Sequence, residues 1–203
     1  MPANRKGLLV VLSSPSGGGK TTIYRAILEK HPEHTYSVSA TTRPMRPNEV
    51  HGKDYSFFSE EEFAAKIARG EFIEWAFVHG YRYGTLHSTV GKALENGEVM
   101  LFDLDVQGAE SMAKAFPDDV VNIFILPPTR EELKKRLVAR QTDNLDVITQ
   151  RLKNAEDEIL RATKYDYLVV NDNLDKCIAQ IDAIITAELC RPKRQLPLDG
   201  WEI

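Results

Sequence analysis

Four short runs of apolar, mostly β-branched residues recur along the chain and predict buried strands. They read GLLVVLSS (7–14), VMLFDLD (99–105), VNIFILP (121–127) and YDYLVVND (165–172). A continuous apolar run is typical of a strand covered on both faces, as in a parallel sheet. Helical patterns such as KTTIYRAILEKH (20–31) and NLDKCIAQIDAIITAELC (173–190) follow the first and last runs. This alternation predicts an α/β fold with a doubly wound parallel sheet.

Two stretches interrupt the alternation and predict attached lobes. Residues 38–89 are rich in Tyr, Phe, Gly and Arg with short strand-like pieces, which indicates a small α+β insert. Residues 129–163 are charged and helical except around RQTDNLD (140–146), which predicts a helical lid of two helices flanking a mobile tip. The remaining residues, 1–37, 90–128 and 164–203, are then expected to form the core domain. The tail RPKRQLPLDGWEI (191–203) is expected to lie loosely on the surface.

Composition narrows the class of protein. A chain of 203 residues with 42% hydrophobic and 28% charged residues can bury one good core, which excludes disordered and fibrous proteins. Its 26 basic and 30 acidic residues give a net charge of -4, so nucleic acid is not an expected partner. Two cysteines without a C-x-x-C pair, no signal-like segment and no membrane-length apolar run predict a cytoplasmic protein that does not enter a membrane. The sequence specifies no oligomeric state.

The stretch SSPSGGGKTT (13–22) joins the first predicted strand to the first predicted helix. It fits the phosphate-loop pattern G-x-x-x-x-G-K-[ST], except that Ser14 takes the place of the first glycine. Glycines allow backbone N–H groups to point at an anion, and the helix N-terminus adds partial positive charge. Lys20 can neutralise phosphate and Thr21 can offer its hydroxyl to Mg²⁺. A glycine-rich connector is the alternative, which the order of strand, loop and helix disfavours. The nucleotide contacts expected here are Ser14, Pro15, Ser16, Gly17, Gly18, Gly19, Lys20, Thr21 and Thr22.

The insert carries candidate contacts for a second substrate. In SVSATTRPMRPNEVHGKDYSFFS (37–59), Arg43 and Arg46 each precede a proline, and Tyr55 follows. Two guanidinium groups and a phenol can hold one phosphate group, although exposed loop arginines are an equally good interpretation of these residues alone.

In EFIEWAFVHGYRYGT (71–85), Glu74 lies among apolar and aromatic residues, where an unpaired carboxylate is costly. Guanine presents two adjacent donors, N1–H and N2–H₂, that a carboxylate can accept, whereas adenine presents an acceptor at N1. Glu74 is therefore a candidate base selector, and the alternative is an outward-facing residue paired with a surface cation. Tyr83 can join the phosphate contacts and Thr85 can bond the base edge.

Two further groups of charged residues follow. Asp103 and Asp105 in LFDLD (101–105) are two apart on a predicted strand, so they should point to one side at its carboxyl end, where α/β sheets bind ligands. One of them could instead cap the next helix. Arg136 and Arg140 are four apart and share a helix face, and Arg151 begins the second helix; pairing with neighbours such as Glu132 is the alternative.

Taken in order, SPSGGGKTT, SVSATTRPMRPNEVHGKDYSFFS, FIEWAFVHGYRYGT, LFDLDVQG and VVNDNLD make the chain resemble a guanylate kinase of the P-loop nucleoside monophosphate kinase group. The resemblance extends from about residue 7 to residue 190, and the segments of the insert are more specific than the phosphate loop. It implies transfer of the γ-phosphoryl group of Mg·ATP to GMP, and to dGMP, by a P-loop NTPase core with a GMP-binding lobe (38–89) and a lid (129–163).

The resemblance also implies roles for single residues. The phosphate clamp of GMP falls on Arg43, Arg46, Tyr55 and Tyr83, and the guanine contacts fall on Ser39, Glu74, Thr85 and Asp105. Asp103 would organise Mg²⁺ with Thr21, the lid arginines Arg136, Arg140 and Arg151 would close over the transferred phosphate, and Asn171 would lie near adenine. Ser14 and Gln141 depart from the family's usual glycines, and Asn171 alone could equally be a turn residue.

Two alternatives of other kinds stay open. One is a phosphate-loop kinase for another phosphorylated small molecule, such as a ribose bisphosphate, which would have little use for Ser39, Glu74 and Thr85. The other is a catalytically inactive module that binds phosphopeptides, which we expect to lack the phosphate loop. Lys20, Thr21 and the lid arginines favour the enzyme.

Overall fold

The centre of the molecule is a parallel sheet. The computed structural model describes residues 6–78, 80–138 and 145–195, with the backbone alone for 145–148. Within these residues the sheet has five strands in the order β2-β7-β1-β8-β9, and every pairing is parallel. The strands are β2 (Thr35–Tyr36), β7 (Val99–Asp103), β1 (Leu8–Ser13), β8 (Val120–Leu126) and β9 (Tyr167–Val170). The four predicted runs are confirmed as strands, and β2 is an additional edge strand of two residues, too short to leave an apolar pattern.

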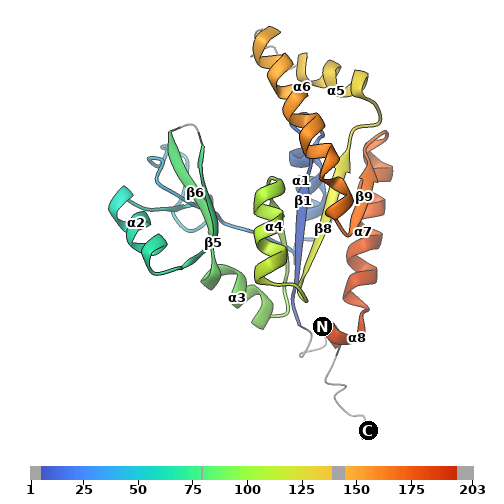
Figure 1. The fold of residues 1–203 in the computed structure, drawn as a ribbon. Helices are drawn as coiled ribbons and strands as arrows, with labels where there is room; N and C mark the ends of the chain where they lie inside the picture. The colour runs from blue at the N-terminus through green and yellow to red at the C-terminus, as the bar shows by residue number, and fades with distance from the viewer. Residues whose placement is uncertain (1–5, 79, 139–144, 196–203) are drawn as a thin grey trace, which may run out of the picture.

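Both faces of this sheet are covered by helices, as the continuous apolar runs predict. Alternate side chains of β1 point to opposite faces: Leu8, Val10 and Leu12 join one buried cluster, whereas Leu9 and Val11 join another. Helices α1 (Lys20–Lys30) and α7 (Leu174–Leu189) pack on the first cluster, and α3 (His87–Glu95) and α4 (Val106–Ala115) on the second. The arrangement is the predicted doubly wound α/β core (Figure 1).

A second, smaller sheet lies beside the core, on the left in Figure 1. It has the order β4-β3-β6-β5, formed by β4 (Ser56–Phe57), β3 (Ala40–Thr41), β6 (Tyr81–Leu86) and β5 (Phe72–Val78). Helix α2 (Glu60–Ala68) begins at a capping box made by Ser59 and Glu62, and it buries Phe63 against Ala40, Leu86 and Phe72. The predicted α+β insert therefore has a small core of its own.

Two antiparallel helices lie at the end of the molecule where β8 ends (Figure 1). Helix α5 (Arg130–Val138) packs Leu133 and Leu137 against Ala155 of α6 (Leu145–Leu160), which confirms the two predicted helices. The short 3-10 helix η1 (Ala162–Lys164) leads from α6 to β9. None of the helices in the described ranges is both long and apolar enough to cross a bilayer.

The chain after α7 differs from the expected loose tail. Residues Pro192–Gln195 form helix α8, and the Arg194 side chain is 1% exposed. Its guanidinium donates to the carbonyl oxygen of Gly7 at 3.0 Å and to those of Asp118 and Asp119 at 3.4 Å. Burial lowers the pKa of Arg194, and the carboxylate of Asp119, 3.9 Å from Nη1, offsets part of that effect. The expectation of a loose tail is therefore wrong for residues 192–195. The buried Arg194 guanidinium needs hydrogen-bond partners, and the carbonyl groups that it finds in the core hold the segment in place. Residues 196–203 lie outside the described part.

We predict that Arg194→Ala destabilises the protein by about 3 kcal/mol, because it leaves three carbonyl groups without their charged donor and opens a cavity. Urea unfolding followed by circular dichroism measures the effect. Lys193→Ala is the matched control, since the Lys193 side chain is 40% exposed and should change stability by less than about 0.5 kcal/mol. Equal unfolding midpoints for the two variants would contradict the anchoring role.

Candidate functional site

The loop between β1 and α1 has the backbone geometry of an anion site. Gly17 and Gly19 adopt φ angles of 90° and 97°, a region that glycine reaches without strain. The amide of Gly18 donates to the carbonyl of Pro15 at 2.9 Å, which closes the loop. Gly19 is the N-cap of α1, where no side chain accepts from the first amides and the first turn holds no acidic residue. These amides and the helix dipole are available to a negatively charged ligand.

Asn171, directly after β9, holds this loop in place. Its Nδ2 donates to the carbonyl of Gly18 at 2.9 Å, and its own carbonyl accepts from Nη2 of Arg136 at 3.1 Å. A Cβ atom at position 19 would lie 2.5 Å from Nδ2, so Gly19 is required by close approach as well as by its φ angle. Asn171 therefore links the loop, through its side chain, to α5, through its backbone carbonyl, which is more than the role of a turn residue.

Ser14, the departure from the glycine pattern, is buried within the loop. Its hydroxyl donates to the carbonyl of Pro15 at 3.1 Å. A Cβ atom at Gly18 would lie 2.7 Å from Ser14 Oγ, so the serine side chain occupies space that Gly18 leaves open. The loop thus accommodates the substitution through the glycine four residues later.

The loop lines a cavity of about 330 Å³ that also receives acidic side chains. Its walls are residues 14–22 together with Asp103, Asp105 and Glu158. Lys20 Nζ lies 2.7 Å from Asp103 Oδ1 and donates to the carbonyl of Leu104 at 3.4 Å. Burial raises the pKa of Glu158, and the charge of Lys20 lowers it in part. Glu158 comes from α6 and was missed by sequence reasoning, because it belongs to no motif and only the tertiary fold brings it here.

The two aspartates that were predicted to share one strand do not lie in the same element of the structure. Strand β7 ends at Asp103, and Asp105 is the N-cap of α4, where its Oδ1 accepts from the amide of Gly108 at 2.8 Å. The expectation of a shared strand is wrong for Asp105, and the capping alternative describes it. Both residues nevertheless border the cavity at the carboxyl end of the parallel strands, as predicted.

Glu74 lies in β5 at a β-bulge. Strand β6 pairs Leu86 with Phe72 and Thr85 with Glu74, which leaves Ile73 as an extra residue. The Thr85 hydroxyl, on a side chain that is almost fully buried, donates to Glu74 Oε1 at 2.6 Å. Burial raises the pKa of Glu74, the Thr85 bond lowers it in part, and the charge of Asp105 raises it further. The carboxylate is thus partnered inside the fold, and the predicted pair of Glu74 and Thr85 is in contact.

The candidate phosphate clamp is partly assembled. Arg43 stands 5.4 Å from the centre of the Tyr55 ring, and the Tyr55 and Tyr83 rings meet edge to face at 5.9 Å. Nη2 of Arg43 donates to Glu49 Oε1 at 2.6 Å, and this bond raises the pKa of Arg43. Sequence reasoning missed Glu49, since only the folded turn brings its carboxylate to both arginines.

The remaining predicted residues occupy several positions. Glu49 Oε2 also accepts from the backbone amide of Arg46 at 2.8 Å, while the Arg46 side chain is exposed. Ser39 precedes β3, and its carbonyl accepts from the amide of Ser56 at 2.9 Å. Nε of Arg136 donates to Glu132 at 3.0 Å, so the alternative of a neighbouring ion pair is also realised. Arg151 lies in α6. Arg140 and Gln141 lie outside the described residues.

Comparisons with known proteins extend over nearly the whole chain. A family model described as guanylate kinase matches residues 6–188. The guanylate kinase of Chelativorans sp. (strain BNC1) is 47% identical over 197 residues, 97% of this chain and 90% of that protein. That of Sphingopyxis alaskensis is 47% identical over 198 residues, 98% of this chain and 90% of that protein. The crystal structure of guanylate kinase from Anaplasma phagocytophilum superposes with a TM-score of 0.74 at 35% identity, over 97% of this chain and 93% of that one.

The raised pKa of Glu74 predicts a pH-dependent stability difference. The folded protein holds the proton of this carboxyl more tightly than the unfolded chain does, so stability from Glu74 is present below its ordinary pKa of 4.5 and lost as pH rises through the raised value. A glutamine at this position does not ionise, so Glu74→Gln does not lose stability as pH rises. Its amide oxygen can still accept the hydrogen bond from Thr85. The variant's advantage in free energy of unfolding over wild type should therefore be larger at pH 8 than at pH 4.5.

Urea unfolding of both proteins at the two pH values measures this difference. Glu61→Gln is the control, because Glu61 is exposed and a hydrogen bond from its own backbone lowers its pKa, so this variant should gain nothing at pH 8. A difference between Glu74→Gln and wild type that stays constant or shrinks with rising pH would show that burial does not penalise the Glu74 charge.

Proposed function

The chain belongs to the guanylate kinase family, and from this we propose that it transfers the γ-phosphoryl group of ATP to GMP, giving ADP and GDP, and to dGMP, giving ADP and dGDP. The observation that carries the proposal is the hydrogen-bonded pair of the half-buried Glu74 and the buried Thr85 at the bulge of β5. A carboxylate kept in a desolvated position accepts the N1–H and N2–H₂ donors of guanine, whereas adenine opposes it with an acceptor. The pair therefore selects the base of the acceptor nucleotide.

ATP is proposed to bind at the phosphate loop. The loop of residues 14–19 surrounds its phosphates, and Lys20 and the hydroxyls of Thr21 and Thr22 contact them, because all of these residues line one cavity at the N-terminus of α1. Asn171 contributes by fixing the carbonyl of Gly18, so that the loop amides keep their direction.

The donors around this cavity fit Mg²⁺. Asp103 and Thr21 offer the oxygen ligands that this ion prefers, and both line the same space. Carboxylates facing a polyphosphate would repel it, and a divalent cation between them would offset that repulsion. When bound, Mg²⁺ supplies neutralisation of the phosphate oxygens and a template for their orientation. Lys20, held 2.7 Å from Asp103, stays close enough to share a phosphate with that ion.

GMP is proposed to bind between the second sheet and the core. Arg43, Arg46, Tyr55 and Tyr83 hold its phosphate, and Ser39, Glu74, Thr85 and Asp105 surround its base. The Arg43 side chain is already fixed by Glu49 and by the ring of Tyr55, which lowers the entropy lost when it grips a phosphate. Asp105 keeps one carboxylate oxygen on Gly108, and its second oxygen can accept from the guanine amino group.

The reaction needs positioning and charge neutralisation rather than a general base, because the acceptor phosphate is already ionised. We assign residues 38–89 to a GMP lobe, 129–163 to a lid, and the remainder to the core. Closure of the lid brings Arg136, Arg140 and Arg151 to the transferred phosphate and excludes water, which would otherwise accept the phosphoryl group. Both cysteines are free thiols, Cys177 buried and Cys190 exposed, which suits an enzyme of the cytoplasm.

The proposal is tested by measuring ADP release from Mg·ATP with GMP, dGMP, AMP, CMP, UMP or a ribose bisphosphate as acceptor. We expect turnover with GMP and dGMP that exceeds turnover with each other acceptor by at least about a hundredfold. Turnover with the ribose bisphosphate alone would point to a different phosphate-loop kinase. A folded protein without turnover on any acceptor would point to a binding module, and either result overturns the proposal.

The proposed clamp predicts a selective defect in Arg43→Ala. Losing one guanidinium that stabilises the transferring phosphoryl group costs several kcal/mol, so kcat/KM for GMP should fall on the order of a hundredfold or more. The KM for ATP should change little, since Arg43 lies in the second sheet's lobe. Steady-state kinetics with each substrate varied in turn separates the two effects.

Two variants complete this experiment. Arg69→Ala, in the same lobe, removes an exposed arginine that pairs with Glu71, and it should leave both substrates unaffected. Asn171→Ala should instead raise the KM for ATP, because the loop carbonyl loses its donor. Normal GMP turnover in Arg43→Ala would remove Arg43 from the clamp.

A further inference from the structure

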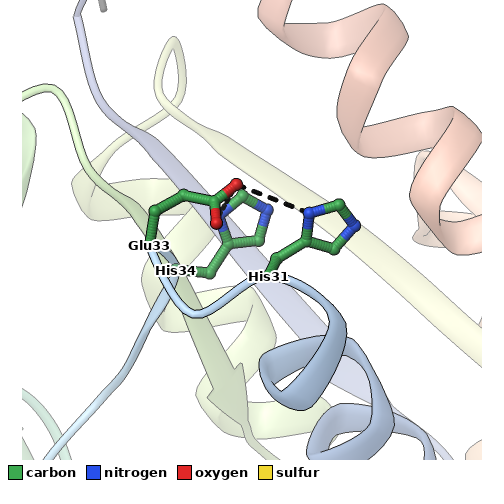
Figure 2. Close-up of side chains that lie close together, drawn as sticks. All are labelled: His31, Glu33 and His34. Carbon is green, nitrogen blue, oxygen red and sulfur yellow. Dashed lines mark ion pairs between the residues drawn. The ribbon is translucent and has the colours of Figure 1, made fainter.

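Two histidines and a glutamate gather at the opposite end of α1 from the phosphate loop (Figure 2). Glu33 Oε1 lies 3.4 Å from Nδ1 of His31 and 3.9 Å from Nδ1 of His34. One possible ligand atom from each of the three residues lies within 4.8 Å of the others. The reaction proposed above uses none of them.

The local sequence His31-Pro32-Glu33-His34 builds this arrangement. Helix α1 ends at Lys30, and the amide of His34 donates to the carbonyl of His31 at 3.0 Å, which closes a four-residue turn. Proline at the second position of such a turn fixes its φ angle in advance. The turn stacks the two imidazoles at 4.8 Å with an angle of 14° between their planes, so both rings are held on the same side as Glu33.

A second carboxylate lies beside His31. Asp182 of α7 places Oδ1 3.3 Å from Nε2 of His31, although the two are not aligned for a hydrogen bond, and it also pairs with Lys30. A histidine that binds a metal typically donates its other ring N–H to a carboxylate, and Asp182 is the carboxylate within reach of His31.

We propose that His31, Glu33 and His34 bind one divalent transition-metal ion of the Zn²⁺ class, with the fourth position left to water. Ligand atoms at Zn–N and Zn–O distances of about 2.1 Å in a tetrahedron stand about 3.4 Å apart. The glutamate and His31 are already at that separation, and the pair with His34 is 3.9 Å apart. The Glu33 and His31 side chains are 44% and 30% exposed and can adjust, while His34, at 8%, is held by its surroundings.

The ligand set distinguishes this site from the one proposed for Mg²⁺. Imidazole nitrogens favour Zn²⁺ and its neighbours in the first transition row, whereas Mg²⁺ prefers oxygen ligands only. The 11 residues of α1 place the cluster about 16 Å from Lys20, so a bound ion does not touch the substrate phosphates. The inference is therefore independent of the proposed kinase reaction.

The experiment titrates the full-length, nucleotide-free protein with Zn²⁺ in excess Mg²⁺, in competition with a chromophoric chelator. We expect one Zn²⁺ per chain in wild type, and affinity at least about tenfold weaker in Glu33→Gln and in His31→Gln/His34→Gln. His87→Gln is the matched control, because His87 is an exposed histidine outside the cluster, and it should bind as wild type does. Circular dichroism checks that each variant is folded, and Glu33→Gln alone serves as the test if the double variant is not.

Binding of Co²⁺ provides a second, spectroscopic test of the proposed site. Its visible absorption in wild type should show the strong bands of a four-coordinate site, which Glu33→Gln weakens and His87→Gln retains. Zn²⁺ affinity that is the same in wild type and in Glu33→Gln, or binding that is lost in Cys190→Ser instead, would overturn the proposal. The cluster would then be an ion-pair network without a metal.

Discussion

Burial of β1 on both faces is the constraint on which the rest of the molecule depends. Its five apolar residues 8–12 are fully enclosed between two helical layers, and it is paired on both edges by β7 and β8. A strand fixed in this way cannot shift or rotate, so the loop that follows it has one position. The parallel register then brings the ends of neighbouring strands to the same edge, which is how Asp103 and Asn171 reach Lys20 and Gly18.

The lobe of the second sheet holds charged side chains that are partly buried. Its own core is small, and the Glu74 carboxylate of this lobe is desolvated at a cost in free energy. Arg43 is instead stabilised by its ion pair with Glu49. A carboxyl group whose pKa is raised by burial is typical of a ligand site. Under the proposed function, the core sheet holds the phosphates of ATP, and the separately packed lobe binds the phosphate and the base of the acceptor.

The sequence allowed the elements and the motif residues to be predicted, because both depend on local patterns. Apolar runs marked the strands, and the order of strand, glycines, Lys20 and helix marked the loop. What could not be predicted depends on residues far apart in the chain: Asn171 against Gly18, Arg194 against Gly7, and Glu158 at the cavity. The N-cap role of Asp105 was foreseen only as an alternative, since the strand's last residue is set by its partner strand.

The bulge at Ile73 gives β5 one residue more than the facing stretch of β6. Successive side chains of a strand alternate between its faces, so one inserted residue reverses the facing of everything beyond it. At the bulge the pairing advances by two residues on β5, Ile73 and Glu74, against the one residue Thr85 on β6. Gly84, where a Cβ atom would lie 2.8 Å from the carbonyl of Glu74, allows the two strands to close over that irregularity. Deletion of the single codon for Ile73 would therefore restore a regular ladder with Glu74 still opposite Thr85, so the bulge shapes the strand locally while the pairing of Glu74 with Thr85 tolerates a change of length at that position.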